Sequence, residues 1–216
     1  AMTSLRPGDD EPMLVEGYGI VFFAPGTGTG SSEVPEHLKQ RLINDMRKNG
    51  IGSPSAQARA DDDLKPFMSL SPEQILDLKD TAVVLVQGLI PPGATEGTRF
   101  DLLVTAVDTQ TTSLTGSTLW TAPLAINGSN TSFQYIRPSA EGRGQAYIDP
   151  QGPTEGQAAV DWQRQAVVVL GGRVMEGRRI ELVLNQPSWT RSRLIANRIN
   201  ERFGKSTDPR PLAEPQ

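Results

Sequence analysis

The chain of 216 residues has no cysteine, a single histidine and no long apolar run, and each absence excludes a class of function. Without cysteine it can hold neither a disulfide framework nor a thiolate metal site. His37 alone cannot supply the base or the ligands of the usual serine and zinc hydrolases. The longest apolar runs, 81–86 and 166–170, are strand-length and far shorter than the roughly 18 residues of a membrane span.

Basic charge is also scarce, since 21 Lys and Arg stand against 25 Asp and Glu and leave a net charge of -4. Nucleic acid is therefore not an expected partner, because its binders usually present a basic stripe to the phosphates. Hydrophobic residues make up 37% of the chain, which is typical of a folded protein. Residues 1–12 and 205–216 are rich in Pro, Asp, Glu, Gly and Ser, so we predict flexible tails there.

Between these tails, residues 13–204 are predicted to form an α+β body, with two subdomains over about 13–125 and 126–204 as one option. Leu38, Leu42 and Met46 recur every four positions and predict a helix over 33–48. A final helix is predicted around Ile195 and Ile199. Alternating or β-branched runs predict strands, which we place at 14–23, 81–89, 99–107, 117–121, 132–136, 145–148, 166–170 and 180–184.

Shorter signals support two further features. Ser71 followed by Pro72 and, at the third position, Gln74 predicts a short helix with a capping box. An internal repeat joins Ala82–Gly88 to Ala166–Gly172, and Glu96–Leu102 to Glu176–Leu182. In each copy the pattern predicts a strand, a glycine turn and a second strand. We therefore predict mainly antiparallel sheets built from two related hairpin units, with the two main helices packed on them.

The order of several segments along the chain resembles the flagellar P-ring protein family from Leu14 to about Phe203. The matching segments include Gly17–Val21, Gly26–Gly28, the helix that ends before Gly50, Leu89–Pro92, Ser113–Leu119 and Ile195–Asn200. The stretch 52–76 looks like an insertion in the family pattern, and the family's leader and later C-terminal portion have no counterpart here.

This resemblance implies a periplasmic structural protein, not an enzyme, with no cofactor, whose copies close into a ring around the flagellar rod at the peptidoglycan layer. Expected partners are copies of the chain, the rod and the outer-membrane ring proteins. Glycine-rich and proline-rich segments then become a candidate self-assembly surface, which consists of Gly17, Tyr18, Gly19, Gly26, Thr27, Gly28, Pro91 and Pro92.

Other interpretations stay open beside this one. The loop Gly26–Gly30 lies between a strand and a helix, as phosphate loops do, but it lacks their lysine, so a tight turn is the better interpretation. The acids Asp61–Asp63 fit a solvated loop better than an ion site. Tyr18 and the three tryptophans, Trp120, Trp162 and Trp189, are candidates for a sugar-stacking surface. A peptidoglycan-binding module, or a subunit of a non-flagellar envelope assembly, is therefore the alternative function.

Overall fold

The computed structural model describes residues 3–5, 11–22, 33–51, 65–126, 138–153, 155–177 and 182–203. The chain divides into two compact units. One is Pro12–Arg178, and the other combines Ala1–Glu11 with Arg179–Gln216.

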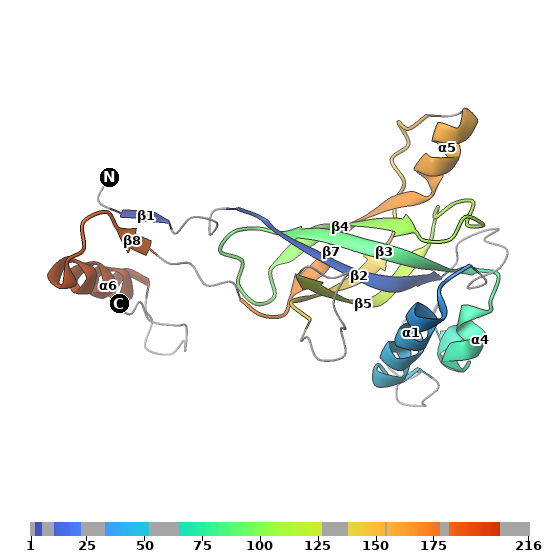
Figure 1. Cartoon of the computed structure of the whole chain (residues 1–216), viewed down its shortest axis with the longest axis horizontal. Coiled ribbons are helices and arrows are strands. Elements are labelled where there is room, and N and C mark those ends of the chain that lie inside the picture. Colours follow the sequence, from blue (N-terminus) through green and yellow to red (C-terminus); the bar gives the residue numbers. More distant parts are fainter. Residues whose placement is uncertain are drawn as a thin grey trace. The chain divides into compact units, whose positions relative to one another are not determined.

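The larger unit is built around a closed barrel of six strands (Figure 1). Its strands are β2 (Met13–Phe22), β3 (Thr81–Ile90), β4 (Arg99–Ala106), β5 (Thr118–Ile126), β6 (Ala140–Gln145) and β7 (Gln165–Val174). Their order around the barrel is β2, β3, β4, β7, β6, β5, and the pairing of β2 with β5 closes it. Every neighbouring pair is antiparallel, which confirms the α+β class with antiparallel sheet.

Helices in this unit are α1 (Glu36–Lys48), α3 (Lys65–Met68), α4 (Pro72–Leu76) and α5 (Gly156–Gln163). The predicted helix over 33–48 is α1, which begins after Pro35 and buries Leu38, Leu42, Ile43 and Met46. Past its end Gly50 takes a φ of 82°, where a left-handed residue is needed, and Ile51 donates from its amide to the Met46 carbonyl.

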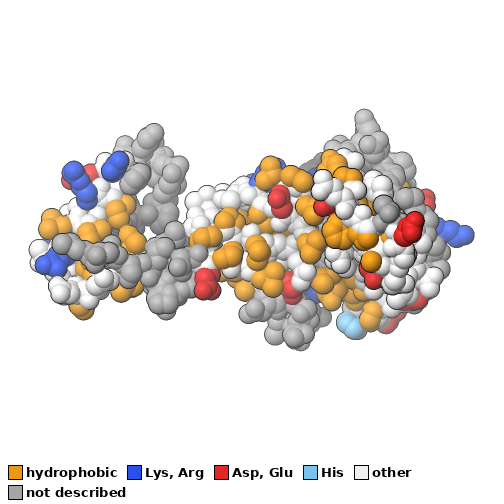
Figure 2. All heavy atoms as spheres, turned by 90° about the horizontal axis from the view of Figure 1, so that it is seen from above, with side chains coloured by type: hydrophobic (Ala, Val, Ile, Leu, Met, Phe, Trp, Pro, Cys, Tyr) orange, Lys and Arg blue, Asp and Glu red, His pale blue; other side chains and the backbone are white. Residues whose placement is uncertain are grey.

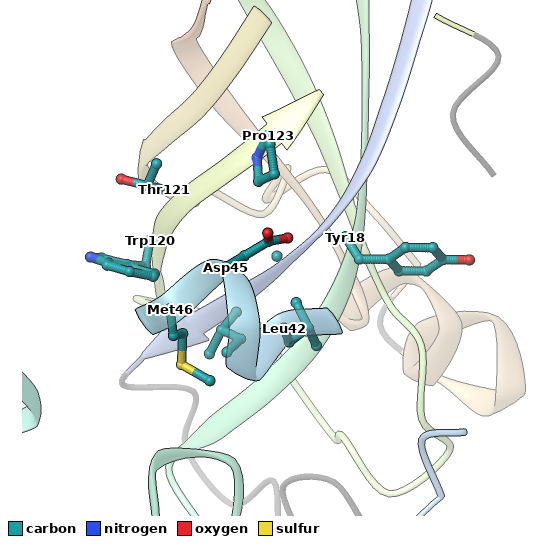
Figure 3. Close-up of a pocket in the computed structure, with 9 residues that line it drawn as sticks. Tyr18, Leu42, Asp45, Met46, Trp120, Thr121 and Pro123 are labelled. Atoms are coloured by element: carbon teal, nitrogen blue, oxygen red, sulfur yellow. The ribbon is translucent and has the colours of Figure 1, made fainter. Parts of the chain in front are cut away.

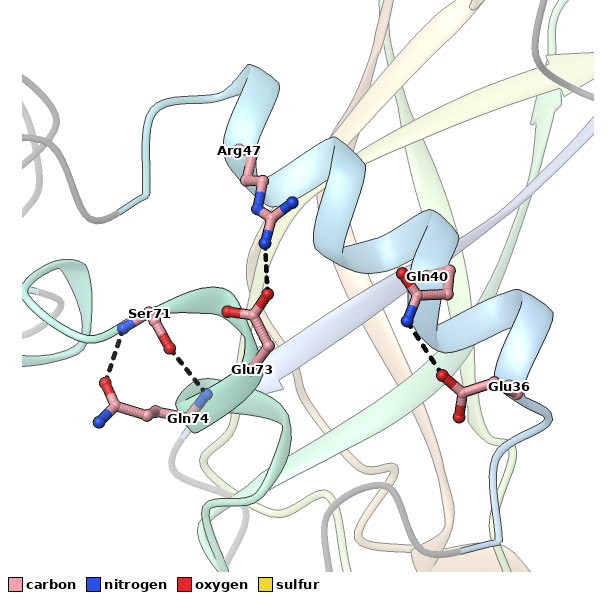
Figure 4. Close-up of polar contacts among 6 residues, drawn as sticks. All are labelled: Glu36, Gln40, Arg47, Ser71, Glu73 and Gln74. Atoms are coloured by element: carbon pink, nitrogen blue, oxygen red, sulfur yellow. Dashed lines mark hydrogen bonds and ion pairs between the residues drawn. The ribbon is translucent and has the colours of Figure 1, made fainter.

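The predicted capping box is present at the start of α4 (Figure 4). The Gln74 amide donates to Ser71 Oγ, and the Ser71 amide donates to Gln74 Oε1 at 2.9 Å. An ion pair between Arg47 and Glu73 then joins α1 to α4. The capping box stabilises the start of α4, the ion pair lies between the two helices, and both helices pack on the barrel.

Two apolar clusters stabilise the larger unit. The first fills the barrel, where Phe100, Leu102 and Val104 of β4 point inward at alternate positions. The second lies outside the barrel, where Ile20, Phe22 and Val83 of β2 and β3 meet the buried face of α1 and α4. Strands β2 and β3 are therefore apolar on both faces, because a helix layer covers part of their outer side.

The internal repeat marks two glycines that make room for one aromatic ring. A Cβ on Gly88 would lie 2.5 Å from Phe100 Cε2, and a Cβ on Gly172 would lie 2.6 Å from the same ring. Both glycines sit on strands next to β4, one on β3 and one on β7. The ring of Phe100 therefore needs a glycine on either side.

The two copies of the repeat differ in what their second segments do. In the first copy β3 pairs with β4 as an antiparallel hairpin. In the second, β7 pairs with β4 and β6, and among the described residues the following strand β8 (Leu182–Leu184) pairs with β1 (Thr3–Leu5). In the closed barrel β7 bonds to β4. Strand β4 therefore stands where the second segment of the second copy was predicted to pair with β7.

The smaller unit contains β1, β8 and α6 (Trp189–Phe203). Thr3–Leu5, within the predicted N-terminal tail, is thus paired with β8. The predicted strand at 132–136 and the predicted C-terminal tail at 205–216 lie outside the described residues. The optional subdomain boundary near residue 125 falls at the end of β5. Strand β6, which follows this boundary, pairs with β5 in the same barrel.

Candidate assembly surfaces

The first three residues of the predicted assembly surface lie on β2, but they face different ways. Gly17 and Gly19 are buried and point into the barrel. A Cβ at Gly17 would lie 2.1 Å from the Pro123 carbonyl oxygen, and one at Gly19 would lie 2.9 Å from Ala122 Cβ. These glycines let β2 and β5 approach closely where the barrel closes.

Tyr18, between them, points outward and borders a groove between α1 and β5 (Figure 3). We name this surface the β5 groove. It is lined by Tyr18, Gly19, Ile20, Leu42, Asp45, Met46, Trp120, Thr121 and Pro123. Its cavity measures about 10 Å³, which is space for about one water molecule. The groove is therefore suited to contact with a protein surface rather than to holding a small-molecule substrate.

Among the remaining predicted surface residues, Pro91 and Pro92 are not brought together with Tyr18. Pro91 and Pro92 begin the β3–β4 turn, which follows the Met13–Ile90 pair at one end of the barrel. Pro91 is half-buried and Pro92 is exposed. A cavity of about 260 Å³, lined by Met13 and Ile90 among others, lies at the same end. Gly26, Thr27 and Gly28, with the rest of the Gly26–Gly30 loop, lie outside the described residues.

A second surface, absent from the sequence-based prediction, lies on the outside of β4 and β7. We name it the β4–β7 face and define it by its exposed apolar side chains, which are Leu103, Tyr147, Val167, Val169 and Leu170. Leu103 is the direct cross-strand partner of Val167, and Val167 also bridges to Tyr147. Figure 2 views the barrel from its β4 side and shows hydrophobic side chains across it. The sequence signal for this face is the run of consecutive valines at 167–169. Such a run places apolar groups on both faces of a strand.

Leu170 projects from a β-bulge on this face. It is the one non-glycine residue with a positive φ, 52°, in the described part of the chain. Its amide donates to Asp101 Oδ1 at 2.7 Å, and its carbonyl accepts from Arg99 at 3.2 Å. The register between β4 and β7 shifts at the same place. Two polar side chains therefore hold an exposed leucine in a conformation that leucine disfavours.

The entry to α1 is fixed by one acid that has several donors. Glu33 accepts hydrogen bonds from the Thr109 amide at 2.9 Å, from Thr109 Oγ1 at 2.6 Å and from Gln110 Nε2 at 3.1 Å. The hydrogen bonds from Thr109 are the main reason why the pKa of Glu33 is lowered to about 2. The carboxylate thereby anchors the start of the helix layer to the loop after β4.

A second acid, Asp108, is buried within the loop after β4 and orders it. Asp108 is buried, and its Oδ1 accepts from the Thr111 amide at 2.6 Å and from Thr111 Oγ1 at 2.8 Å. Arg164 donates to the Asp108 carbonyl, while its buried Nε has no hydrogen-bond partner among the described residues. These groups join the loop to the segment between α5 and β7, so their role is in the fold.

Residues weighed for other chemistry are dispersed. His37 is exposed on α1, as expected for a solvated histidine. Trp120 lies in the β5 groove, whereas Trp162 donates from its indole to the Asp149 carbonyl. Within the described ranges no group of three or more His, Asp or Glu side chains is placed to hold a metal ion. Asp61–Asp63 lie outside those ranges.

None of the helices in the described segments is both long and apolar enough to cross a membrane.

Comparison with known proteins connects the whole fold to one family. A family model described as "Flagellar P-ring protein" matches residues 8–213. A flagellar P-ring protein of Rhodospirillum rubrum is 27% identical over 205 residues, covering 92% of this chain and 48% of the relative. Relatives of the same name from Geotalea uraniireducens and Aquifex aeolicus are 28% and 27% identical, with 89% and 88% of this chain covered.

The chain spans about half the length of these relatives, 48% or 49% in each. The match from residue 8 to residue 213 takes in the barrel and the helix layer, together with β8 and α6 of the smaller unit. This chain belongs to the flagellar P-ring protein family.

Proposed function

We propose that this chain is a structural part of a ring subunit in the flagellar basal body, in which copies of the chain contact one another around the rod. The observation that carries the proposal is the family match over residues 8–213. A filled, closed barrel suits this role, because it gives a rigid unit without open sheet edges. The proposal assigns the chain a role in assembly and no catalytic step.

The location and partners follow from the same resemblance. We place the protein in the periplasm at the peptidoglycan layer, with the rod and the outer-membrane ring proteins as its neighbours. The family name, which describes a ring, supports this placement.

The β5 groove is the proposed contact surface that includes Tyr18. Two half-buried aromatic side chains, Tyr18 and Trp120, line it, and aromatic groups are common at the centre of protein interfaces. Gly17 and Gly19 support this surface from inside the barrel, because they bring β5 close to β2. The Pro91–Pro92 turn is a separate candidate contact at the barrel end.

We also propose that the two repeated segments derive from a duplicated β unit. A Cβ added at either of their shared glycines, Gly88 or Gly172, would meet the same Phe100 ring, which supports a common packing requirement.

Labelling of isolated basal bodies tests the proposed function. Antibodies raised against this chain would be applied to basal bodies purified from cells that make it, and bound gold particles would be located by electron microscopy. We expect label on the ring that encircles the rod near the peptidoglycan layer. Protein that is abundant in the cells but gives no label on any basal body would contradict the proposal.

A further inference from the structure

The end of the barrel at which β2 begins holds the cavity of about 260 Å³, which we name the barrel-end cavity. It is lined by Met13, Ile90, Ile126, Ser139, Glu176 and Gly177, all within the larger unit. These residues come from the start of β2, the ends of β3 and β5, the position before β6 and the positions after β7. Five of the six strands therefore border one cavity in the mouth of the barrel, which is a common place for ligand sites.

Two of the lining residues continue the inner face of the barrel beyond its filled core. Met13 lies two positions before Val15, and Ile126 lies two positions after Leu124. Val15 and Leu124 are fully buried members of the core. Side chains two positions apart on a strand share a face, so Met13 and Ile126 point to the inside of the barrel. The core thus forms the floor of the cavity, and these side chains form part of its wall.

Two polar side chains also line the cavity, and neither has a partner of its own. Glu176 lies two positions after the buried Val174, and Ser139 directly precedes β6. Within the described ranges, the Glu176 carboxylate and the Ser139 hydroxyl make no hydrogen bond or ion pair. The backbone of Ser139 is held in place, because its amide donates to the Leu124 carbonyl at 2.9 Å. Both side chains are therefore available to a ligand.

The size and the lining of the cavity select one class of ligand. An apolar cavity of about 150 Å³ is enough to hold benzene, so the barrel-end cavity has room for a ring with a short chain. Its apolar lining is Met13, Ile90 and Ile126, and a methionine sulfur contacts aromatic rings favourably. An ammonium group carries a positive charge and three donors, which suit a carboxylate and a hydroxyl. An anionic ligand would instead meet Glu176 with like charge.

We infer that the barrel-end cavity binds a small organic amine. Its ring or alkyl part lies among Met13, Ile90 and Ile126, and its ammonium group lies at Glu176 and Ser139. Because every lining residue belongs to one chain, this site goes beyond the proposed ring function and does not depend on it.

Methyl NMR with a matched set of small molecules tests this site. The chain is isotopically labelled at its methionine methyl groups, of which Met13 lines the cavity and Met46 lies in the helix layer. The probe is phenethylamine, which is positively charged at neutral pH. Phenethyl alcohol has the same ring and chain without the charge, and hydrocinnamate carries the opposite charge.

We expect phenethylamine to shift the Met13 signal and to leave the Met46 signal in place. The amine should bind about twofold to fivefold more tightly than the alcohol, which is the range for an exposed charge pair. Hydrocinnamate should bind more weakly than the alcohol, because its charge is repelled by Glu176.

Three variants locate the site. Glu176→Gln should reduce the affinity for phenethylamine to that for phenethyl alcohol, and should leave the affinity for the alcohol unchanged. Glu155→Gln, at an exposed acid just before α5, is the matched control and should change neither affinity. Ile126→Trp fills the cavity from the end of β5 and should abolish the response of Met13 to both compounds.

Several results would overturn the inference. Equal affinities for the amine and the alcohol would show that the cavity does not distinguish charge, and an unshifted Met13 signal with every probe would show that it binds none of them. A Met13 signal that moves when unlabelled chain is added, but not with phenethylamine, would assign the cavity to a protein contact. None of these results changes the outcome of labelling basal bodies, so the failure of this site and the failure of the proposed function are distinguishable.

Discussion

The outside of the barrel carries large apolar residues both on β2 and β3 and on β4 and β7, yet among the described residues a helix layer covers only the first pair. On β2 and β3, the outward residues Phe22 and Val83 are buried beneath α1 and α4. On β4 and β7, the outward residues Val167 and Val169 are exposed. The side chains are similar in chemistry. What differs is the presence of a covering element within the chain.

An apolar outer face therefore has a role only in relation to what lies against it. The face under α1 and α4 stabilises the folded chain, because its residues Ile20, Phe22 and Val83 are buried within one molecule. The β4–β7 face contributes less to folding, because its side chains keep between 38% and 59% of their surface exposed. A continuous exposed apolar patch of this kind is uncommon on a protein surface.

The largest expected effect is on the covered side. Phe22 has no exposed surface and packs against Phe67 with ring centroids 4.7 Å apart. Phe22→Ala should lower the free energy of unfolding by about 3–5 kcal/mol, measured by urea denaturation. Val169→Ala on the β4–β7 face is the control and should change it by less than about 0.5 kcal/mol. Equal losses at both sites would remove the distinction between the two sides.

The glycines around Phe100 allow the packing inside the barrel to be tested in the same way. Gly172→Ala should cost about 1–3 kcal/mol in unfolding free energy, because its Cβ would meet the Phe100 ring at 2.6 Å. Phe100→Leu in the same chain should recover part of that loss, since the ring is removed. Gly177→Ala is the matched control, with its nearest neighbour at 3.4 Å. Calorimetric melting of the parent chain, the three single variants and the double variant would decide. A loss of stability in the double variant larger than the sum of the losses in Gly172→Ala and Phe100→Leu would contradict the explanation.

A smaller effect of opposite sign is expected at the bulge. Leu170→Asn should leave the unfolding free energy unchanged or raise it by up to about 1 kcal/mol, because it relieves a left-handed leucine. Leu103→Asn, also on the β4–β7 face but in regular strand, should lower it slightly. Urea denaturation of both variants gives the comparison. A clear loss of stability in Leu170→Asn would mean that this leucine supports the fold.

The smallest effect concerns the acid that anchors the helix layer. The pKa of Glu33 is about 2 in the folded chain, below its ordinary value of 4.5, so the folded state holds its carboxylate more strongly. Its contribution to stability is complete above pH 4.5 and is lost as the pH falls through 2. Glu33→Gln should therefore flatten the fall in melting temperature between pH 4.5 and pH 2.

Two companion variants make this pH test specific. Thr109→Val removes the Oγ1 donor to Glu33 and should flatten the same curve in part. Thr121→Val, at a threonine in the β5 groove, should leave the curve as it is. Identical curves for the parent chain and Glu33→Gln would show that these hydrogen bonds do not stabilise the fold.

Local patterns were sufficient to predict several elements. The spacing of Leu38, Leu42 and Met46 predicted α1, and the Ser71–Gln74 pattern predicted the capping box of α4. Both depend on residues at most eight positions apart, so neighbours along the chain decide them. The order of segments also predicted the family, and the match over residues 8–213 confirms it.

The sequence predicted the candidate surfaces less completely than it predicted these helices. Gly17, Tyr18 and Gly19 were predicted together, but alternation along β2 turns Tyr18 outward and both glycines into the barrel. The β4–β7 face was missed because a run of valines does not reveal which of its two sides is covered. That depends on β7 pairing with β4 and β6, across separations of tens of residues.

By itself, the sequence determined the class of the chain: its lack of cysteine and excess of acid, its capped helices, its strand-forming runs and its family. Only the tertiary structure decided that the strands close into a barrel, that α1 and α4 cover the outside of β2 and β3, and that the outward valines of β4's partner β7 are exposed. The physical reason is that propensity and capping act between near neighbours, whereas strand pairing and burial depend on which distant segments meet.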